Sequence, residues 1–217
     1  MIRPDDVDLI IFDLGGTIIS EIKPDYEAVR RAFKKLGWEM PVSEVTDFSP
    51  YMALPSNEFY QAITPPEKRA RWQEAREMVR REYYATFLEF SEFYPGVKQT
   101  LASLNQRGLR LAVYSRAESR LVIDVVTKLG IEKHFIYLKQ PGDDVFDKEN
   151  VARKIITGFK AKAAIVGDSM LDIEVAGKTG ALSVGVLYGY GGKEMGKGDF
   201  TLNRFSDLLG IFSTKKG

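Results

Sequence analysis

The sequence predicts an α/β protein with a parallel β-sheet flanked by helices and an all-helical insertion near its N-terminus. After residue 94, apolar runs of strand length alternate with segments of helical spacing, and this alternation is typical of a parallel sheet wrapped by helices. Residues 24–93 show helical spacing and no convincing strand. We therefore predict a core of residues 1–20 and 94–217 and a helical insertion of residues 21–93.

The composition is that of an ordinary globular protein and excludes several kinds of site. The 217 residues are 44% hydrophobic, and 31 Lys and Arg balance 30 Asp and Glu, so charge gives no argument for nucleic acid or a membrane surface. The absence of cysteine excludes disulfides, thiolate catalysis and cysteine-bound zinc. The early apolar run at residues 9–12 is too short for a signal or a membrane span, so we expect a cytoplasmic protein.

The elements follow in a regular order. The run DLIIFDL predicts a buried strand that ends at Gly15 and Gly16. Later strands are expected near residues 109–114, 135–138, 163–166 and 182–187. Helices are expected between them at residues 97–106, 119–129, 148–157 and 171–179, and in the insertion at residues 24–37 and 65–90. An insertion placed after the first strand is expected to be a lid over the strand ends.

Three carboxylates stand at two of these predicted strand ends. Asp13 follows the first strand, Asp168 follows the strand at residues 163–166, and Asp172 is four residues later on the same helix face. The carboxyl ends of parallel strands open on one crevice, and oxygen ligands of this kind suit Mg2+. One aspartate alone would be as readily a turn or helix-cap residue, but the combination favours a metal site.

These segments resemble the motifs of the haloacid dehalogenase superfamily. The resemblance covers nearly the whole chain: FDLGGT at residues 12–17, YPGV at 94–97, LAVYS at 111–115 and GDSMLD at 167–172. It implies a Rossmann-like core with a cap and the activity of a magnesium-dependent phosphatase for a small phosphorylated metabolite. From the near-neutral charge we expect no nucleic-acid or membrane partner, and we expect a monomer or homodimer.

The resemblance also implies roles for individual residues. Asp13 corresponds to the nucleophile that forms an aspartyl-phosphate, and a carboxylate needs no deprotonation at neutral pH. The magnesium site corresponds to Asp13, the backbone carbonyl of Gly15, Asp168 and Asp172. The phosphate-binding residues correspond to Gly16, Thr17, Ser115 and Arg116. Taken singly, the hydroxyls of Thr17 and Ser115 could equally be helix caps.

The active-site lysine is ambiguous in the sequence. Lys148 stands at the start of the helix KENVARKII, as in one version of the family pattern. Lys139, in LKQPGDD, partly resembles the other version, in which proline follows the lysine directly. We favour Lys148 because of its position at the start of a helix, where its acidic neighbours also suit the first turn.

Gly15 is the departure that matters for function. Phosphatases of this family usually have an aspartate here that protonates the leaving alcohol, and its loss lowers the rate by a factor of about 100 to 10,000. The nearest replacement is Glu21, with Asp25 as a second choice. The alternatives are a catalytically impaired phospho-ligand-binding protein and, with less support, a phosphonatase-like hydrolase. The latter needs a cap lysine that SPYMALPSNEF lacks, and the retained metal motif disfavours dehalogenation.

Overall fold

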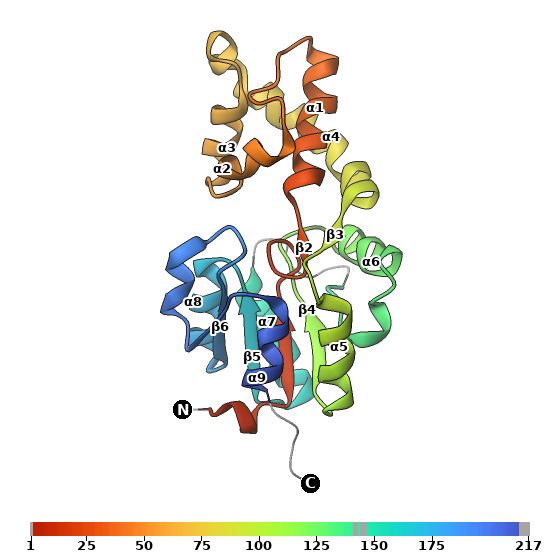
Figure 1. The fold of residues 1–217 in the computed structure, drawn as a ribbon, viewed down its shortest axis with the longest axis vertical. Coiled ribbons are helices and arrows are strands. Elements are labelled where there is room, and N and C mark those ends of the chain that lie inside the picture. Colours follow the sequence, from red (N-terminus) through yellow and green to blue (C-terminus); the bar gives the residue numbers. More distant parts are fainter. Residues whose placement is uncertain (1, 141–142, 144–146, 213–217) are drawn as a thin grey trace. The chain divides into compact units, whose positions relative to one another are not determined.

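The chain folds into two compact units. The computed structural model describes residues 2–140, 143 and 147–212. The core unit comprises the chain up to Ser20 and from Glu92 onward, and the insertion unit comprises Glu21–Ser91 (Figure 1). The division therefore falls two residues before the boundary at residue 93 that the sequence suggests.

The core unit is built on a five-stranded sheet in which every pairing is parallel. The strand order is β4 (Arg110–Val113), β1 (Leu9–Phe12), β5 (Ala163–Gly167), β6 (Leu182–Val186) and β7 (Phe200–Leu202). Phe12 is level with Val113 on one side and Val166 on the other. The residues that follow β1, β4 and β5 consequently emerge side by side at one edge, which confirms the predicted parallel α/β architecture.

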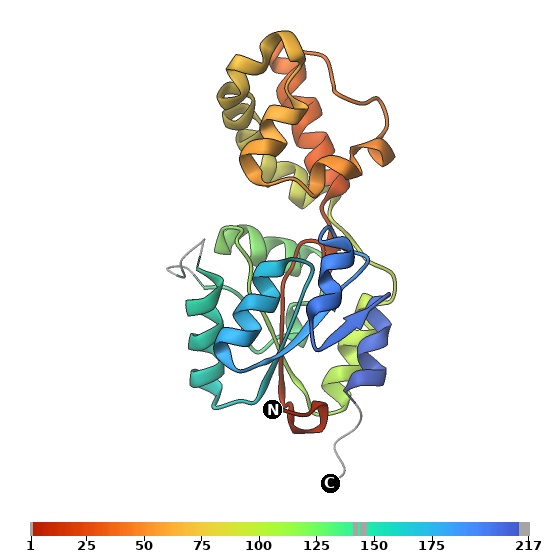
Figure 2. The ribbon, with the colours of Figure 1, turned by 90° about the vertical axis from the view of Figure 1, so that its left-hand side faces the viewer.

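Helices cover both faces of this sheet (Figure 2). On one face, α7 (Lys148–Phe159) and α8 (Met170–Thr179) pack through Val151, Ile155 and Val175 against Leu9 and Ile11 of β1. The opposite side carries α5 (Val97–Gln106) and α9 (Leu208–Ile211). The helix α6 (Ser119–Lys128) follows β4. The central strands β1 and β5 are therefore buried on both faces, which is why they read as continuous apolar runs.

The strand predicted at residues 135–138 does not form. Over residues 135–138 the chain forms only a single bridge, from Tyr137 to Ala112 of β4. Two backbone hydrogen bonds hold it there: Ile136 N donates to Leu111 O at 2.8 Å, and Val113 N donates to Tyr137 O at 2.9 Å. The segment thus lines the edge of the sheet briefly and continues to Lys139 without forming a strand.

A short antiparallel ribbon joins the two units along the chain. Its strands β2 (Ile19–Ser20) and β3 (Glu92–Phe93) pair Ile19 with Phe93 and Ser20 with Glu92. The sequence analysis assigned Glu92 and Phe93 to the insertion and found no strand there. Two residues per strand are too few to create a recognisable alternation of polar and apolar side chains.

The insertion unit is all-helical, with its own apolar core. Its helices are α1 (Ile22–Leu36), α2 (Ser49–Met52), α3 (Ser56–Ile63) and α4 (Trp72–Phe90), the last preceded by a 3-10 helix at Pro66–Arg71. Ion pairs link α1 to α4, from Arg31 to Glu89 and from Lys35 to Glu82. The core includes Phe33, Phe48 and Val79. Most aromatic side chains of the insertion thus stabilise the unit itself.

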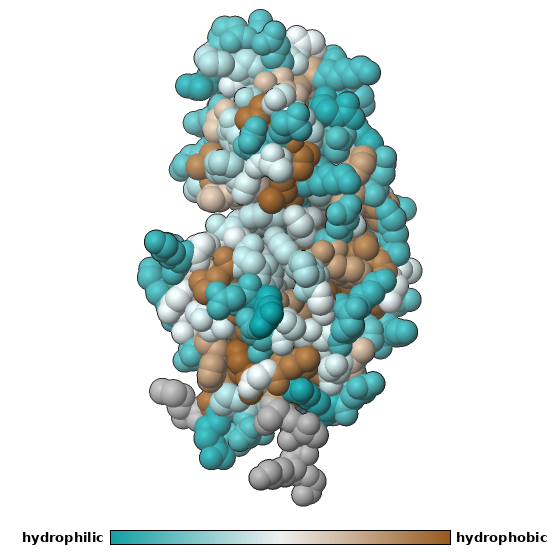
Figure 3. All heavy atoms as spheres, viewed as in Figure 1, coloured by the Kyte–Doolittle hydropathy of each residue, from teal (hydrophilic) through white to brown (hydrophobic). Residues whose placement is uncertain are grey.

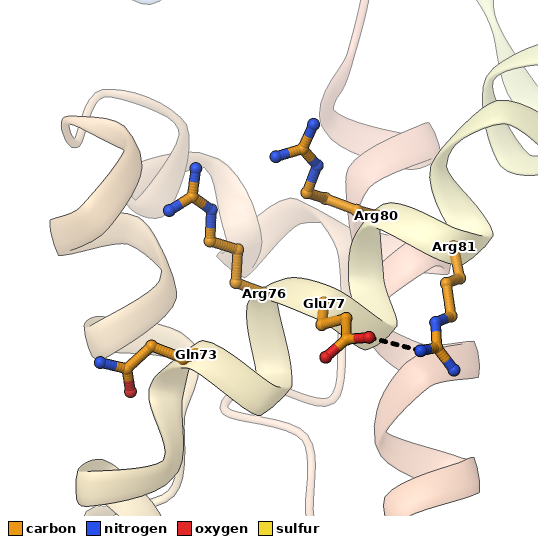
Figure 4. Close-up of a pocket in the computed structure, with 5 residues that line it drawn as sticks. All are labelled: Gln73, Arg76, Glu77, Arg80 and Arg81. Carbon is orange, nitrogen blue, oxygen red and sulfur yellow. Dashed lines mark hydrogen bonds and ion pairs between the residues drawn. The ribbon is translucent and has the colours of Figure 1, made fainter.

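The surface is mainly polar. Leu54 and Ile136 are the exposed large hydrophobic residues of the described chain, and hydrophilic residues are spread over the face in Figure 3 with smaller apolar areas between them. On α4 a hollow of about 410 Å³ is lined by Gln73, Arg76, Glu77, Arg80 and Arg81 (Figure 4). Glu77 and Arg81 form an ion pair there. Among the described helices, none has the length and apolarity needed to cross a membrane.

We expect Asp25 to make the insertion unit less stable as the pH rises. Burial raises the pKa of this carboxyl to about 7 from an ordinary value of 3.8. Because the pKa is raised in the folded state, the protonated Asp25 costs the fold nothing below about pH 4. As the pH rises from about 4 to about 7, the unfolded chain loses this proton more readily than the folded one, and the free energy of unfolding falls. Asp25→Asn is therefore expected to raise the free energy of unfolding by about 2–4 kcal/mol at pH 8 and to have little effect at pH 4.

Tryptophan fluorescence can measure this change in the full chain, because Trp38 and Trp72 both belong to the insertion unit and are the only tryptophans of the sequence. Urea unfolding followed at both pH values gives the difference. The exposed Asp47 in the same unit supplies a matched control, Asp47→Asn, with no pH-dependent gain expected. A gain of equal size at pH 4 and pH 8 would contradict the titration of Asp25 as the cause.

Candidate active site

Three aspartates meet at the carboxyl ends of two neighbouring strands. Asp13 directly follows β1, Asp168 directly follows β5, and Asp172 lies in the first turn of α8. One carboxylate oxygen from each lies within 4.8 Å of the other two, and all three side chains are buried. The shared register of β1 and β5 causes this meeting, and Asp13 N donates to Val166 O at 2.9 Å.

Lys148 joins the cluster from a third element. It is the first residue of α7, whose start is capped by the Asp147 carboxylate, which accepts from Asn150 N at 2.8 Å. The Lys148 ammonium donates to Asp13 Oδ2 at 2.6 Å and to Asp172 Oδ1 at 2.8 Å. Its side chain is only 2% exposed. Lys148 is thus the lysine that bridges two of the carboxylates.

Asp172 is held by several donors at once. The Tyr114 hydroxyl donates to Asp172 Oδ1 at 2.6 Å, and the backbone N–H and hydroxyl of Ser169 both donate to Oδ2. The Tyr114 ring also lies 4.7 Å from the Lys148 ammonium, a distance at which a cation–π attraction operates. The sequence analysis did not select Tyr114. Its only signal was a polar hydroxyl at the end of an otherwise apolar run.

Two glycines make room for Asp168. A Cβ atom on Gly16 would lie 2.1 Å from Asp168 Oδ2, and one on Gly189 would lie 2.3 Å from Asp168 Cβ. Gly16 also has φ +69°, a conformation that favours glycine. The backbone N–H of Tyr190 donates to Asp168 Oδ2 at 2.8 Å. The glycine-rich segment after β6 therefore supplies a direct contact to Asp168.

Burial and charge set the protonation of the cluster. Burial raises the pKa of Asp168 to about 7, with a further increase from the charge of Asp13. Burial likewise raises the pKa of Asp13, although Lys148 opposes this. Burial also raises the pKa of Asp172, but Lys148 and the hydrogen bonds outweigh it and the net pKa is lowered. Despite burial, the two carboxylates raise the pKa of Lys148.

The donor set fits a hard divalent cation. Three buried carboxylates share one ammonium, so their ionised forms leave excess negative charge in a site poorly solvated by water. A cation bound between the oxygens would relieve that repulsion, and an all-oxygen site is of the type that magnesium or calcium prefers. Because Gly16 and Gly189 lack a Cβ atom, the Asp168 side chain can lie against the loop that follows β1 without a steric clash.

The other predicted site residues lie in the loops that follow β1 and β4 and at the start of the insertion unit. Ser115 follows Tyr114 at the end of β4, and its Oγ accepts from Ala117 N at 3.1 Å. Thr17 is fully buried, and its hydroxyl has no hydrogen-bond partner among the described residues. Gly15 is partly buried and Arg116 is exposed. Glu21 is the first residue of the insertion unit, so it adjoins the core along the chain at Ser20.

Comparison with known proteins agrees with this geometry. A family model for "Haloacid dehalogenase-like hydrolase" matches residues 10–186. The chain is 29% identical to a phosphoglycolate phosphatase of Vibrio parahaemolyticus, covering 95% of this chain and 96% of that protein, and 31% identical to one of Vibrio cholerae, covering 85% and 86%. A haloacid dehalogenase-like hydrolase of Streptococcus pneumoniae superposes with a TM-score of 0.78 at 20% identity, covering 96% of this chain and 99% of that one.

The chain belongs to the haloacid dehalogenase-like hydrolases, since the family model spans most of its length. The sequence relatives further support the phosphatase branch, in which the enzyme is a phosphoric monoester hydrolase. The family assignment and the enzyme class made from the four motifs are confirmed.

Proposed function

We propose that the chain is a magnesium-dependent phosphatase that removes the phosphoryl group from a small metabolite through an aspartyl-phosphate on Asp13. The observation that carries the proposal is the buried contact of Asp13 with Lys148, next to Asp168 and Asp172, at the strand edge where ligands bind. A nucleophilic carboxylate needs such a cationic neighbour, because the phosphoryl group it approaches is negatively charged.

The reaction has two steps in this proposal. A carboxylate oxygen of Asp13 forms a bond to phosphorus while the bond from phosphorus to the ester oxygen breaks, and the metabolite leaves as an alcohol after it gains a proton. Water then attacks the phosphorus of the acyl-phosphate, which releases inorganic phosphate and restores the carboxylate. Lys148 stabilises the negative charge shared by Asp13 and the phosphoryl group.

The other roles follow the geometry of the strand ends. Mg2+ would be held by Asp13, the Gly15 carbonyl, Asp168 and Asp172, and it would neutralise the charge of the phosphate oxygens. Asp172 also holds Lys148 in place. Ser115, Arg116, Gly16 and Thr17 would bind the phosphoryl oxygens.

Gly15 leaves the position of the usual acid–base aspartate without a carboxylate. We propose that Glu21 replaces this function in part, because it is only one residue beyond β2, and that turnover is slow as a result. The relatives are named phosphoglycolate phosphatases, so phosphoglycolate is the first substrate to test. The second candidate, a phosphate-binding protein with impaired turnover, is favoured by Gly15 alone.

Removal of the metal provides the first test of the function. We expect protein treated with a chelator and dialysed to show no turnover of p-nitrophenyl phosphate or phosphoglycolate, and Mg2+ to restore it. Calcium is the matched control, since its larger radius and looser coordination should allow binding without comparable turnover. Metal-independent hydrolysis would contradict the mechanism. Binding of phosphate with Mg2+ but no turnover of any substrate would support the second candidate.

A further inference from the structure

The core unit contains a second buried lysine that makes different contacts from Lys148. Lys139 is fully buried, with 0% exposure. Its ammonium donates to the backbone carbonyls of Ser115 and Ala117, each at 2.8 Å. Burial of an ammonium group is unfavourable unless polar partners compensate, so these contacts hold Lys139 and the turn at residues 115–117 firmly together.

The position of Lys139 follows from the edge of the sheet. Tyr137 forms the bridge to Ala112 of β4, and two residues later the Lys139 side chain reaches the turn that follows that same strand. Lys139, which follows the bridge at the edge of the sheet, therefore binds the loop that contains Ser115 through two hydrogen bonds. Lys148, in contrast, contacts only carboxylates among the hydrogen bonds described for its ammonium.

The contacts of Lys139 also set the direction of the backbone N–H groups in the turn at residues 115–117. In a trans peptide the C=O of one residue and the N–H of the next point in opposite directions. The structure contains no cis peptide in its described part, so the carbonyls of Ser115 and Ala117 that face Lys139 direct the N–H groups of Arg116 and Glu118 away from it. The Ser115 Oγ accepts from Ala117 N, which leaves its hydroxyl proton for another acceptor.

We propose that Lys139 is a positioning residue that sets the phosphate-binding turn at Ser115 and Arg116. It acts through the turn, by fixing the direction of the Ser115 hydroxyl and the Arg116 N–H, whereas Lys148 acts directly on the nucleophile. The inference rests on the proposed function in one respect, that the ligand at this strand edge is a phosphoryl group. Its test measures phosphate binding as well as turnover.

The test uses Lys139→Met, Ser115→Ala and the double variant in the full chain with Mg2+. We expect Lys139→Met to weaken the binding of inorganic phosphate and to raise KM by about tenfold, with a smaller change in kcat, as for the loss of one hydrogen bond. Because Lys139 acts in part through the Ser115 hydroxyl, the loss of phosphate affinity in the double variant should be smaller than the sum of the two single losses. The exposed Lys162 gives a control, Lys162→Met, that should leave binding unchanged.

A chemical rescue separates positioning from folding. The chain has no cysteine, so Lys139→Cys introduces the only thiol. Alkylation of the unfolded variant with 2-bromoethylamine, followed by refolding, restores an ammonium group on a side chain of lysine length. The parent chain taken through the same treatment is the control. Recovery of phosphate affinity together with KM is the expected result.

Four results would overturn the inference. They are additive effects in the double variant, unchanged phosphate affinity in correctly folded Lys139→Met, a rescue that restores thermal stability but not affinity, and a parent that binds no phosphate. Lys139-dependent phosphate binding without turnover would instead refute the proposed phosphatase activity and leave the positioning role standing.

Discussion

Asp13→Asn is expected to lower turnover by at least about 10,000-fold, the scale seen when an enzyme loses its nucleophile. The amide has the size and shape of the carboxylate, and its single oxygen can keep one of the two hydrogen bonds, either from Leu14 N, which donates to Asp13 Oδ1 at 2.8 Å, or from Lys148, which donates to Oδ2. The variant should therefore fold normally. It cannot form the acyl-phosphate, because a neutral amide is a poor nucleophile. Steady-state rates with p-nitrophenyl phosphate measure the loss.

The covalent intermediate offers a second measurement of the same prediction. Parent enzyme quenched during turnover of a radiolabelled substrate should carry phosphate in an alkali-labile bond, and Asp13→Asn should carry none. Asp47→Asn, at an exposed aspartate of the insertion unit, is the matched control and should behave as the parent. Activity in Asp13→Asn above about one hundredth of the parent rate would reject Asp13 as the nucleophile.

Gly15→Asp is expected to increase kcat by about 100-fold, the lower end of the range for general acid–base catalysis. Gly15 is partly buried, and its φ lies outside the left-handed region, so an L-aspartate meets no backbone barrier. The new carboxyl would stand two residues after Asp13, where it could protonate the departing alcohol. The increase should be larger for an alkyl phosphate than for p-nitrophenyl phosphate, whose leaving group hardly needs an acid.

The neighbouring glycine supplies the control for this substitution. Gly16→Asp should abolish activity, because φ there is +69° and a Cβ would lie 2.1 Å from Asp168 Oδ2. If Glu21 already provides the acid, Glu21→Gln should slow the parent but have little effect in the Gly15→Asp background. Failure of Gly15→Asp to accelerate alkyl phosphate hydrolysis would mean that protonation of the leaving group does not limit the rate.

Much of the fold was predictable because its signals are local. Buried parallel strands such as β1 and β5 carry no polar side chain, and the intervening helices have clear spacing, with a glycine within two residues of the ends of α5, α6 and α8. The ribbon of β2 and β3 was missed because two residues carry no periodicity. The helix expected from residue 65 begins as an α-helix only at Trp72 and is preceded by a 3-10 helix.

The meeting of the three aspartates was predictable from the shared strand edge, whereas their supporting contacts were not. Tyr114 reaches Asp172 across 58 positions of sequence, and Tyr190 binds Asp168 through its backbone, which any residue type could do. Lys139 and Lys148 looked alike in the sequence. Only the three-dimensional structure assigns one to the carbonyls of a turn and the other to the carboxylates.

The β2–β3 ribbon has a consequence for how this chain can change over evolution. Both ends of the 71-residue insertion Glu21–Ser91 leave the core from adjacent paired residues, Ser20 and Glu92. Replacement of everything between them leaves the register of the five-stranded sheet untouched, because no sheet residue lies inside the exchanged stretch. Recombination at these two points would exchange the whole insertion in a single genetic event and leave the strand-end aspartates in place.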